Sequence, residues 1–310
     1  MLKYIYSAAI LLIGLCIGLL WNHFFMKQAD CHGLSCYTAQ NYNLSELVEQ
    51  PRDLFLNHRN ALQLLGGDKN STTFDHWEPL LNRTTQKAKK HFPLNYRHKS
   101  CAVLGNSAKV IGREQGSFID SHEAVFRINK GPVIGYENDV GSRTTYRVQW
   151  SDFRVPDGED TISIFHLHGS RQNYLKQYIQ WVSYMSAIVQ KNKTLQKQYR
   201  ERTMFFKARL PHDFLIVNYW VMSNAANLWF GEEVPFGSPK KELLTSGELT
   251  VALALHMCDQ VNLFGMSTRK DANRCYYYDD SRTKCRPIGS YIKQFEWLDT
   301  LIREGVLKSY

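Results

Sequence analysis

The sequence is poor in cysteine, with seven in 310 residues, and it contains no internal repeat or low-complexity tract. A chain of this length holds one large or two modest domains with a substantial buried core, which excludes a small scaffold that depends on disulfides. Acidic residues are fewer than basic ones, 29 against 38, which leaves a formal charge of +9. The charge indicates a nucleic acid, an anionic lipid surface or a phosphorylated small molecule as partner. Aromatic residues make up 13% of the chain, which excludes disorder for most of it.

One long apolar run without a charged residue is present, from Tyr4 to Trp21. It has about the minimum length of a transmembrane helix. The tail before it, residues 1–3, holds one lysine, which predicts a cytoplasmic N-terminus and a type II topology. A cleaved signal peptide is the alternative, but residues 19–23 offer no small-x-small cleavage site.

The residues after the run fit a lumenal location. Six cysteines follow it, an even number that allows three disulfides in 15 different connectivities. Four Asn-x-Ser/Thr sequons also follow it, and such sites are glycosylated only in the secretory pathway. They are Asn43, Asn70, Asn82 and Asn192. Nucleic acid is therefore not expected as a partner. The short apolar run favours an early secretory membrane.

Residues 22–100 are polar and aperiodic in places, which predicts a stem and the periphery of the folded domain. Residues 101–310 show short apolar runs at 101–105, 123–129, 161–167 and 260–265, typical of buried strands. Helical periodicity is found between 171 and 200, and again from residue 246. Alternation of strands and helices predicts an α/β domain with a parallel or mixed sheet, whose ligand lies at the carboxyl ends of the strands.

Two loops in this domain have the composition of an anion site. Gly105-Asn106-Ser107 follows a predicted strand, and Thr245-Ser246-Gly247 precedes a predicted helix. The free amides at a helix N-terminus favour an anion. Turns and helix caps of ordinary structural function use the same residues, so this alternative remains open.

Three motifs in order give the chain a family resemblance. Residues 101–147 resemble the large motif of eukaryotic sialyltransferases, with Gly105-Asn106-Ser107, Arg127-x-Asn129-x-x-Pro132 and Gly135-x-Glu137-x-Asp139-Val140-Gly141-x-x-Thr144-Thr145-x-Arg147. Residues 244–265 resemble the small motif, with Ser246-Gly247 and His256-x-Cys258-Asp259, and Cys275-Tyr276-Tyr277-Tyr278-Asp279 is similar to the short third motif. We therefore expect a variant Rossmann-like domain of the glycosyltransferase A type behind the anchor.

The resemblance implies roles for individual residues. Asn106, with Ser107 beside it, and Asn129 would bind the cytidine monophosphate (CMP) part of the donor CMP-sialic acid. Thr245, Ser246 and Gly247 would contact its nucleotide and sialic acid parts, with Tyr276 near the phosphate. Cys101 would pair with Cys258 and Cys275 with Cys285, which leaves Cys31 and Cys36 as the remaining two of the six cysteines after the apolar run. No Asp-x-Asp is present to hold a divalent metal, and the leaving group is a monophosphate, so we expect no metal or other cofactor.

The sequence departs from the family at the catalytic base. The family has a histidine in a His-x-x-x-x-Glu motif after the third motif, and Tyr291 stands at that position here, five residues before Glu296. Three alternatives follow: Tyr291 acts as base with help from Lys293, a nearby carboxylate (Asp279, Asp280 or Glu296) replaces it, or the protein binds without turnover. A phenol of pKa about 10 is a poor base unless it is perturbed. We expect His122 and His256 to be structural.

The motifs thus predict an inverting sialyltransferase of the Golgi membrane that acts on terminal galactosides of glycoproteins or glycolipids. The end of the large motif favours an α2,3 linkage. The tyrosines 276–278 between Cys275 and Cys285 resemble α2,6 members. The alternative function is a donor- or glycan-binding member without efficient catalysis.

Overall fold

A computed structural model describes residues 51–67, 71–92, 96–150, 160–167, 174–200, 214–221, 245–266, 278 and 292–310. Among these residues, no helix combines the length and the apolar character that crossing a membrane requires. The anchor predicted at residues 4–21 lies outside them. So do several other predicted features: Cys31, Cys36, Asn43, Asn70, Cys275, Tyr276, Cys285 and Tyr291.

The described part is built on a seven-stranded sheet with the order β5-β4-β3-β2-β1-β6-β7, in which each neighbouring pair is parallel. The strands are β1 Cys101–Leu104, β2 Ala124–Ile128, β3 Tyr146–Trp150, β4 Ile162–His166, β5 Phe214–Ile216, β6 Val261–Phe264 and β7 Lys308–Ser309. The predicted α/β class with a parallel sheet is confirmed. Strands β1, β2, β4 and β6 lie where the apolar runs predicted them.

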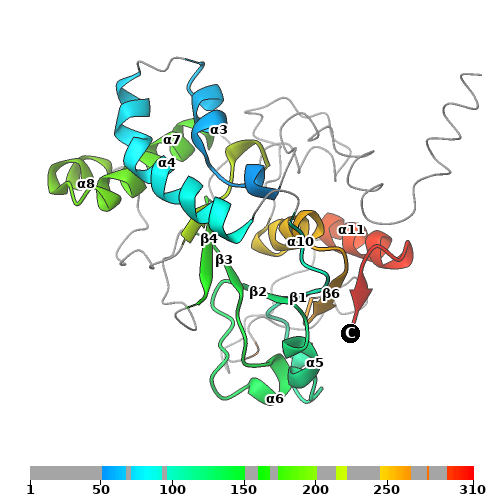
Figure 1. Cartoon of the computed structure of the whole chain (residues 1–310). Helices are drawn as coiled ribbons and strands as arrows, with labels where there is room; N and C mark the ends of the chain where they lie inside the picture. The colour runs from blue at the N-terminus through cyan, green and yellow to red at the C-terminus, as the bar shows by residue number, and fades with distance from the viewer. Residues whose placement is uncertain are drawn as a thin grey trace, which may run out of the picture.

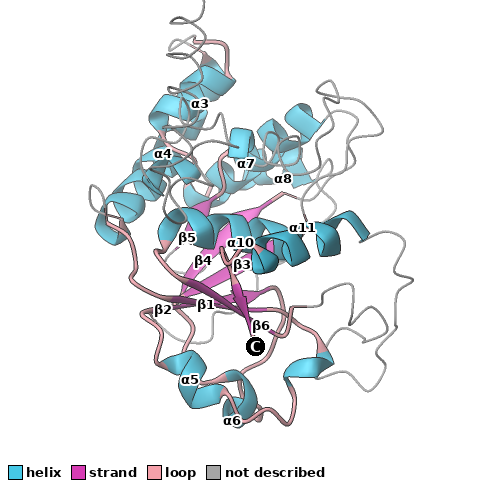
Figure 2. Cartoon of the chain, turned by 90° about the vertical axis from the view of Figure 1, so that its right-hand side faces the viewer, coloured by secondary structure: helices cyan, strands magenta, loops and turns pink. Residues whose placement is uncertain are grey.

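Helices cover both faces of this sheet (Figures 1 and 2). One face carries α4 Thr72–His91, α7 Tyr174–Val189, α10 Ser246–Met257 and α11 Ile292–Arg303, with α3 His58–Leu64 and α8 Lys193–Arg200 at its margin. The other face carries the short helices α5 Gly116–Asp120 and α6 Glu137–Val140. The short 3-10 helices η2 Pro51–Leu54 and η3 Ala108–Val110 complete the described elements.

Alternate residues of the strands supply two separate cores. Cys101 and Val103 of β1 belong to the larger core, beneath α4, α7 and α10, whereas Ala102 and Leu104 belong to the smaller core next to α5 and α6. Every β1 residue is buried, as expected for a central strand covered on both sides. β1 therefore appears in the sequence as a short continuous apolar run.

Folded elements also lie before residue 101. Within the segment predicted as stem and domain periphery, α4 forms twenty residues of helix and contacts both α7 and β5. Its buried residues Trp77, Leu80, Leu81, Thr84 and Ala88 recur at intervals of one to four residues among polar ones. The helix starts at Ser71, whose hydroxyl accepts a hydrogen bond from the Thr73 amide.

Two predicted glycosylation sites lie on or next to described helices. Asn82 is exposed on α4, while Thr84 of the same sequon is fully buried and donates to the backbone. Asn192 precedes α8, and its Oδ1 accepts a hydrogen bond from the Leu195 amide at 3.1 Å. The Asn192 sequon therefore also serves as a helix cap, and glycosylation at either position stays a prediction.

Candidate functional site

The sequence-predicted residues lie at the carboxyl ends of the parallel strands. Asn106 follows β1, and Asn129 follows β2 directly. Trp150 and His166 are the last residues of β3 and β4 and are register partners. Because parallel strands end at one edge, the four residues belong to the same side of the sheet. We call this side the carboxyl edge.

The sheet order changes direction between β1 and β6, and the turn after β1 lies at this point. β1 pairs with β2 on one side and with β6 on the other. The amides of Gly105 and Ser107 donate to the carbonyl oxygens of Phe264 and Gly265, at 2.8 and 3.0 Å. Such a switch point is the usual ligand position in open α/β sheets.

Asn106 and Ser107 occupy this turn in different ways. Asn106 is 8% exposed, and its Nδ2 donates to the carbonyl oxygen of Ile128 at 3.1 Å. Its Oδ1 has no hydrogen-bond partner among the described residues. Ser107 is fully buried, and its hydroxyl accepts from the Lys109 amide at the start of η3. The Asn106 amide can therefore accept from a ligand, whereas the Ser107 hydroxyl supports the turn.

Asn129 adopts a left-handed backbone conformation, with φ of 49°. Its Oδ1 accepts a hydrogen bond from the Trp150 amide at 3.0 Å, which ties the end of β2 to the end of β3. A non-glycine residue with positive φ is strained unless its surroundings hold it, and such residues concentrate at functional sites.

Arg147 holds the backbone at this position. Its guanidinium is buried, and Nη1 donates to the carbonyl oxygens of Asn129 at 2.6 Å and Gly131 at 3.1 Å. Arg127, the register partner of Arg147 on β2, has a similar task at the end of α6, where it donates to the carbonyl oxygens of Val140, Gly141 and Arg143. Both motif arginines therefore fix loops of the large motif.

The N-terminus of α10 carries the second predicted loop. Thr245 forms a capping box with Glu248: the Thr245 hydroxyl accepts from the Glu248 amide, and the Glu248 carboxylate accepts from the Thr245 amide at 2.6 Å. The amides of Ser246 and Gly247 have no hydrogen-bond partner among the described residues. The Ser246 hydroxyl lies 3.0 Å from Nε2 of His166. Within the described part of the chain this helix end thus leaves two amide donors without a partner, the arrangement that suits an anion.

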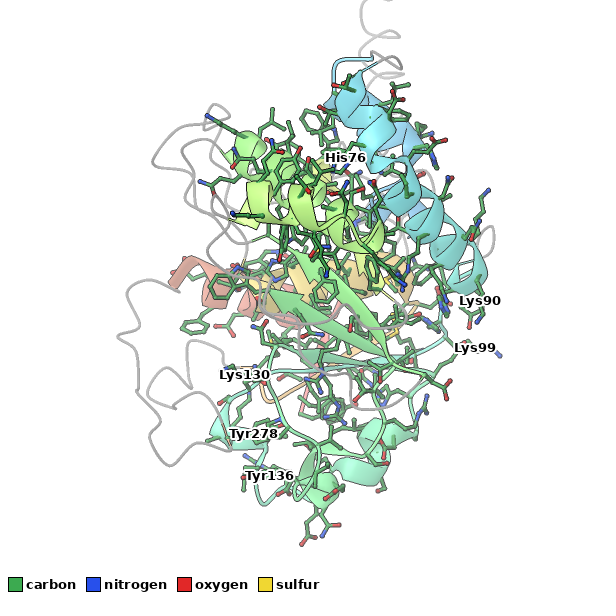
Figure 3. The ribbon with its side chains drawn as sticks, turned by 90° about the vertical axis from the view of Figure 1, so that its left-hand side faces the viewer. His76, Lys90, Lys99, Lys130, Tyr136 and Tyr278 are labelled. Atoms are coloured by element: carbon green, nitrogen blue, oxygen red, sulfur yellow. A yellow bond between two sulfur atoms is a disulfide. The ribbon has the colours of Figure 1, made fainter. Side chains whose placement is uncertain are left out.

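One residue of the third motif is described, and it contacts the loop after β2. The Tyr278 hydroxyl donates to the carbonyl oxygen of Pro132, and its ring packs edge-on against Tyr136, with centroids 5.2 Å apart. Figure 3 shows the two tyrosines side by side below Lys130. A Cβ on Gly131 would lie 3.3 Å from the Tyr278 hydroxyl and 2.5 Å from Oδ1 of Asn106. The third motif, the β2 loop and Asn106 therefore meet at one place.

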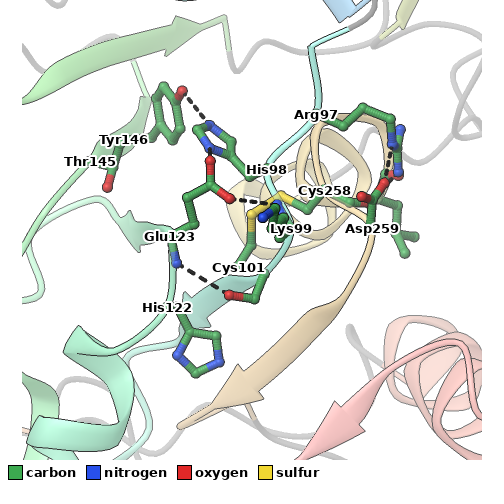
Figure 4. The surroundings of a disulfide bond; sticks show 12 residues. Arg97, His98, Lys99, Cys101, His122, Glu123, Thr145, Tyr146, Cys258 and Asp259 are labelled. Carbon is green, nitrogen blue, oxygen red and sulfur yellow. Dashed lines mark hydrogen bonds and ion pairs between the residues drawn. A yellow bond between two sulfur atoms is a disulfide. The ribbon is translucent and has the colours of Figure 1, made fainter.

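The predicted Cys101–Cys258 disulfide is present, with Cα atoms 6.1 Å apart (Figure 4). It joins the first residue of β1 to the end of α10 across 157 residues. Both cysteines are fully buried. The bond fixes α10 against the central strand at the end opposite to the carboxyl edge.

A polar cluster lies beside this disulfide (Figure 4). His98 Nδ1 lies 3.4 Å from the Glu123 carboxylate and Nε2 lies 2.9 Å from the Tyr146 hydroxyl. Burial lowers the pKa of His98, although hydrogen bonding and attraction to Glu123 act in the opposite direction. Hydrogen bonds from Tyr96 and the Lys99 amide lower the pKa of Glu123. The cluster is at the amino ends of the strands, away from the carboxyl edge.

The two histidines expected to be structural have structural surroundings. His122 is buried, with Nδ1 2.9 Å from the Phe118 carbonyl oxygen and Nε2 2.7 Å from Asn262. Burial and the positive charge of Arg97 lower the pKa of His256 to about 4. The His256 side chain therefore stays uncharged at neutral pH.

The described residues contain no group of three or more His, Cys, Asp or Glu side chains suited to hold a metal ion. The acidic residues Asp279 and Asp280 lie outside them. The absence of a metal requirement stays a prediction.

His166 and Arg147 are the candidate site residues without a predicted role. His166 is 1% exposed and lies in a run that was predicted as a strand. Ligands lie at the carboxyl ends of parallel strands, so this rule identifies His166 once the order of the strands is known. Arg147 is part of the large motif, but its contacts depend on the loop conformation.

Comparison with known proteins gives consistent results. The human CMP-N-acetylneuraminate-beta-galactosamide-alpha-2,3-sialyltransferase 4 is 27% identical over 220 residues, which cover 67% of this chain and 63% of that protein. The mouse CMP-N-acetylneuraminate-beta-1,4-galactoside alpha-2,3-sialyltransferase is 28% identical over 201 residues, covering 59% of this chain and 49% of its own. The chain thus spans between about half and two thirds of the length of these relatives.

A crystal structure of a mammalian sialyltransferase in complex with Gal-beta-1-3GalNAc-ortho-nitrophenol has the same fold. Its TM-score is 0.56 at 19% identity, covering 91% of this chain and 96% of that one. The sequence model of glycosyltransferase family 29 (sialyltransferase) matches residues 44–306. The match covers most of the chain, and the protein belongs to glycosyltransferase family 29, the sialyltransferases.

Proposed function

We propose that this protein transfers sialic acid from CMP-sialic acid to a terminal galactoside of a glycoprotein or glycolipid, by inverting displacement at the anomeric carbon. The observation that carries the proposal is the row of polar groups along the carboxyl edge, from Asn106 through Asn129 to Ser246. The α/β domain would be a variant Rossmann-like glycosyltransferase A type. An α2,3 linkage is favoured by the large motif and by the names of the relatives.

The chemistry of the edge supports a nucleotide monophosphate donor. Amide oxygens and nitrogens, such as those of Asn106 and Asn129, match the donors and acceptors of a pyrimidine and a ribose. The amides of Ser246 and Gly247 at the positive end of α10 favour a phosphate or a carboxylate. In this proposal Thr245 supports the helix end through its capping box, and Tyr276 contacts the phosphate.

We propose Tyr291 as the first candidate for the catalytic base, since it stands at the position of the family histidine. A cationic neighbour such as Lys293 would lower the pKa of the phenol, while Asp279, Asp280 or Glu296 are the alternative bases. General-base help is worth about 10²- to 10⁴-fold in rate, so an inefficient base gives a slow enzyme rather than an inactive one. The missing histidine also favours a second function, a donor- or glycan-binding protein without turnover.

The test is acceptor-dependent release of CMP. The detergent-solubilised full-length protein is incubated with CMP-sialic acid and a panel of β-galactosides, and the products are analysed for linkage. Release of CMP that requires an acceptor supports the enzyme. A product with an α2,6 linkage would show that the favoured α2,3 assignment is wrong. Binding of the donor or of a galactoside without acceptor-dependent release supports the second function, and binding of neither overturns both.

Tyr291→His tests the base. Turnover that rises by about 10² or more means that the native tyrosine is an inefficient base. Turnover that falls means that Tyr291 has a catalytic role of its own.

We propose the Golgi membrane as the location, with residues 1–3 cytoplasmic, 4–21 as a single type II anchor, 22–100 as stem and domain periphery, and 101–310 as the lumenal catalytic domain. No metal or other cofactor is needed in this scheme. Undiminished turnover after chelation with EDTA supports the metal part, and protease protection of the lumenal domain in sealed vesicles supports the topology.

A further inference from the structure

His166 and Ser246 form a buried contact between two elements of the candidate site. Nε2 of His166, at the end of β4, lies 3.0 Å from the hydroxyl of Ser246, the first residue of α10. His166 is 1% and Ser246 9% exposed. The residues are 80 positions apart in the sequence, so the contact exists only through the tertiary fold.

This contact continues the row of hydrogen bonds along the carboxyl edge. Asn106 is tied to the end of β2, Asn129 is tied to Trp150, and Trp150 is the register partner of His166 on β4. The row then passes from His166 to Ser246 at the helix. Three strand spacings of about 4.8 Å place His166 roughly 14 Å from β1. The contact thus ties the N-terminus of α10 to β4, which of the four strands in this row is the farthest from Asn106.

The hydroxyl of Ser246 has capacity beyond this contact. A serine hydroxyl has one donor and two acceptor sites, and the ring nitrogen of His166 occupies one of them. When Nε2–H donates to the oxygen, the hydroxyl hydrogen is left for another acceptor. The neighbouring amides of Ser246 and Gly247, at the positive end of α10, also favour an anion at this helix end.

We propose that His166 is a positioning residue, which through Ser246 fixes the α10 N-terminus for the anionic group of the donor. The inference rests on the proposed function, because it concerns the same site. The anion is either the phosphate or the sialic acid carboxylate of CMP-sialic acid. His166 does not touch the reacting atoms.

The test is calorimetric binding to the full-length protein in detergent, with CMP, sialic acid and cytidine as probes. His166→Phe removes the hydrogen bond and keeps an aromatic ring, and we expect the affinity for CMP to fall about tenfold, the effect of one hydrogen bond to a charged group. His166→Gln restores a donor at the Nε2 position and stays within about threefold of the wild type. Cytidine, which has no anionic group, binds equally to all three proteins.

The probes separate the two anions. Weakened CMP binding assigns His166 to the phosphate. Weakened binding of sialic acid with unchanged CMP binding assigns it to the carboxylate. Equal binding of both probes by wild type and His166→Phe overturns the inference.

Ser183→Ala is the matched control. It removes another buried hydrogen bond, in which Trp77 Nε1 donates to the Ser183 hydroxyl at 2.8 Å, between α4 and α7. We expect the melting temperature of this variant to fall while probe affinities are unchanged. A comparable loss of affinity in the control means that the effect of His166→Phe is general destabilisation and overturns the inference.

A double-variant cycle tests whether His166 acts through Ser246. Ser246→Ala weakens binding at least as much as His166→Phe, because it removes the same contact and the hydroxyl itself, and the double variant is no weaker than Ser246→Ala alone. Additive losses overturn the inference. If His166→Phe does not fold, Ser246→Ala and His166→Gln decide: wild-type binding by Ser246→Ala overturns the inference.

Failure of the inference differs from failure of the proposed function. If the wild-type protein binds neither CMP nor sialic acid, the proposed donor site does not exist and the proposed function fails. If the wild-type protein and a folded His166→Phe variant bind CMP and sialic acid equally well, only the role of His166 fails. Binding is measured without turnover, so the identity of the catalytic base does not enter.

Discussion

Gly105 and Gly265 touch backbone to backbone where β1 and β6 end. A Cβ on Gly105 would lie well inside van der Waals contact with the carbonyl oxygen of Gly265, and 2.7 Å from the sulfur of Met266. The neighbouring amide of Ser107 donates to the same carbonyl oxygen. The turn that presents Asn106 therefore depends on the absence of a side chain at Gly105.

Gly105→Ala is expected to destabilise the protein by about 1–3 kcal/mol and to weaken CMP binding, because the backbone of β6 cannot move without breaking its pairing with β1. Thermal unfolding and calorimetry measure the two effects. Gly112→Ala is the control: an added Cβ there meets nothing within 4 Å, and only its positive φ of 74° is unfavourable. Equal CMP affinity in Gly105→Ala and wild type would contradict the prediction.

Tyr278→Phe removes the hydrogen bond from the third motif to the carbonyl oxygen of Pro132. We expect the KM for CMP-sialic acid to rise about three- to tenfold, since one neutral hydrogen bond contributes about 0.5–1.5 kcal/mol. The KM for the galactoside is expected to change little, because the loop after β2 lies beside Asn106, which belongs to the proposed donor site and not to an acceptor site.

Tyr136→Phe is the matched control for Tyr278→Phe. It keeps the ring that packs against Tyr278 and removes only a hydroxyl without a hydrogen-bond partner among the described residues. Steady-state kinetics of both variants distinguish the two roles. A similar rise of the donor KM in both would mean that the hydrogen bond to Pro132 is unimportant.

The sequence predicts those elements of the fold whose burial is uniform. β1 and β2 are buried along their whole length, so their apolar runs are visible. β3 reads Tyr-Arg-Val-Gln-Trp, and its buried Arg147 and Gln149 conceal the strand because their polar groups are satisfied only in the fold. α4 is similarly hidden, since its buried residues are separated by charged and polar ones.

The candidate site divides in the same way. Asn106, Asn129 and Ser246 follow from the resemblance, because turns and helix ends are encoded in short motifs. The tie between His166 and Ser246 does not, because it joins residues 80 positions apart and depends on the order of the strands. Arg147 is visible as a motif residue, but its carbonyl partners are fixed only by the left-handed Asn129.

Removal of the Cys101–Cys258 disulfide, in a Cys101→Ala/Cys258→Ala variant, is expected to cost about 2–5 kcal/mol, because the bond closes a very long loop. For a domain of this size each kcal/mol lowers the melting temperature by about 2–4 °C, so a fall of roughly 10 °C is expected. Differential scanning calorimetry measures it. An unchanged melting temperature would mean that packing of α10 on β1 holds the site without the bond.

Two histidines with a lowered pKa make the protein sensitive to mild acid. The pKa of His256 is lowered to about 4 by burial and by Arg97, and burial also lowers that of His98. In the unfolded chain both titrate near 6.5, so between about pH 6.5 and 4 the unfolded state binds protons that the folded state does not. Stability is therefore fully present above pH 6.5 and is lost as the pH falls.

The carboxylates act in a separate range of pH. Burial alone would raise the pKa of Asp120, but hydrogen bonds from Ser142 and Arg143 lower it overall, and backbone hydrogen bonds lower that of Asp139. Their contributions are present above the unfolded pKa of about 4 and are lost only below it. We expect the melting temperature to fall steadily from about pH 6.5 to 4.5, and His256→Gln to reduce that slope because it removes one of the two histidines. A slope that is equal in wild type and variant would show that protonation of His256 does not oppose folding.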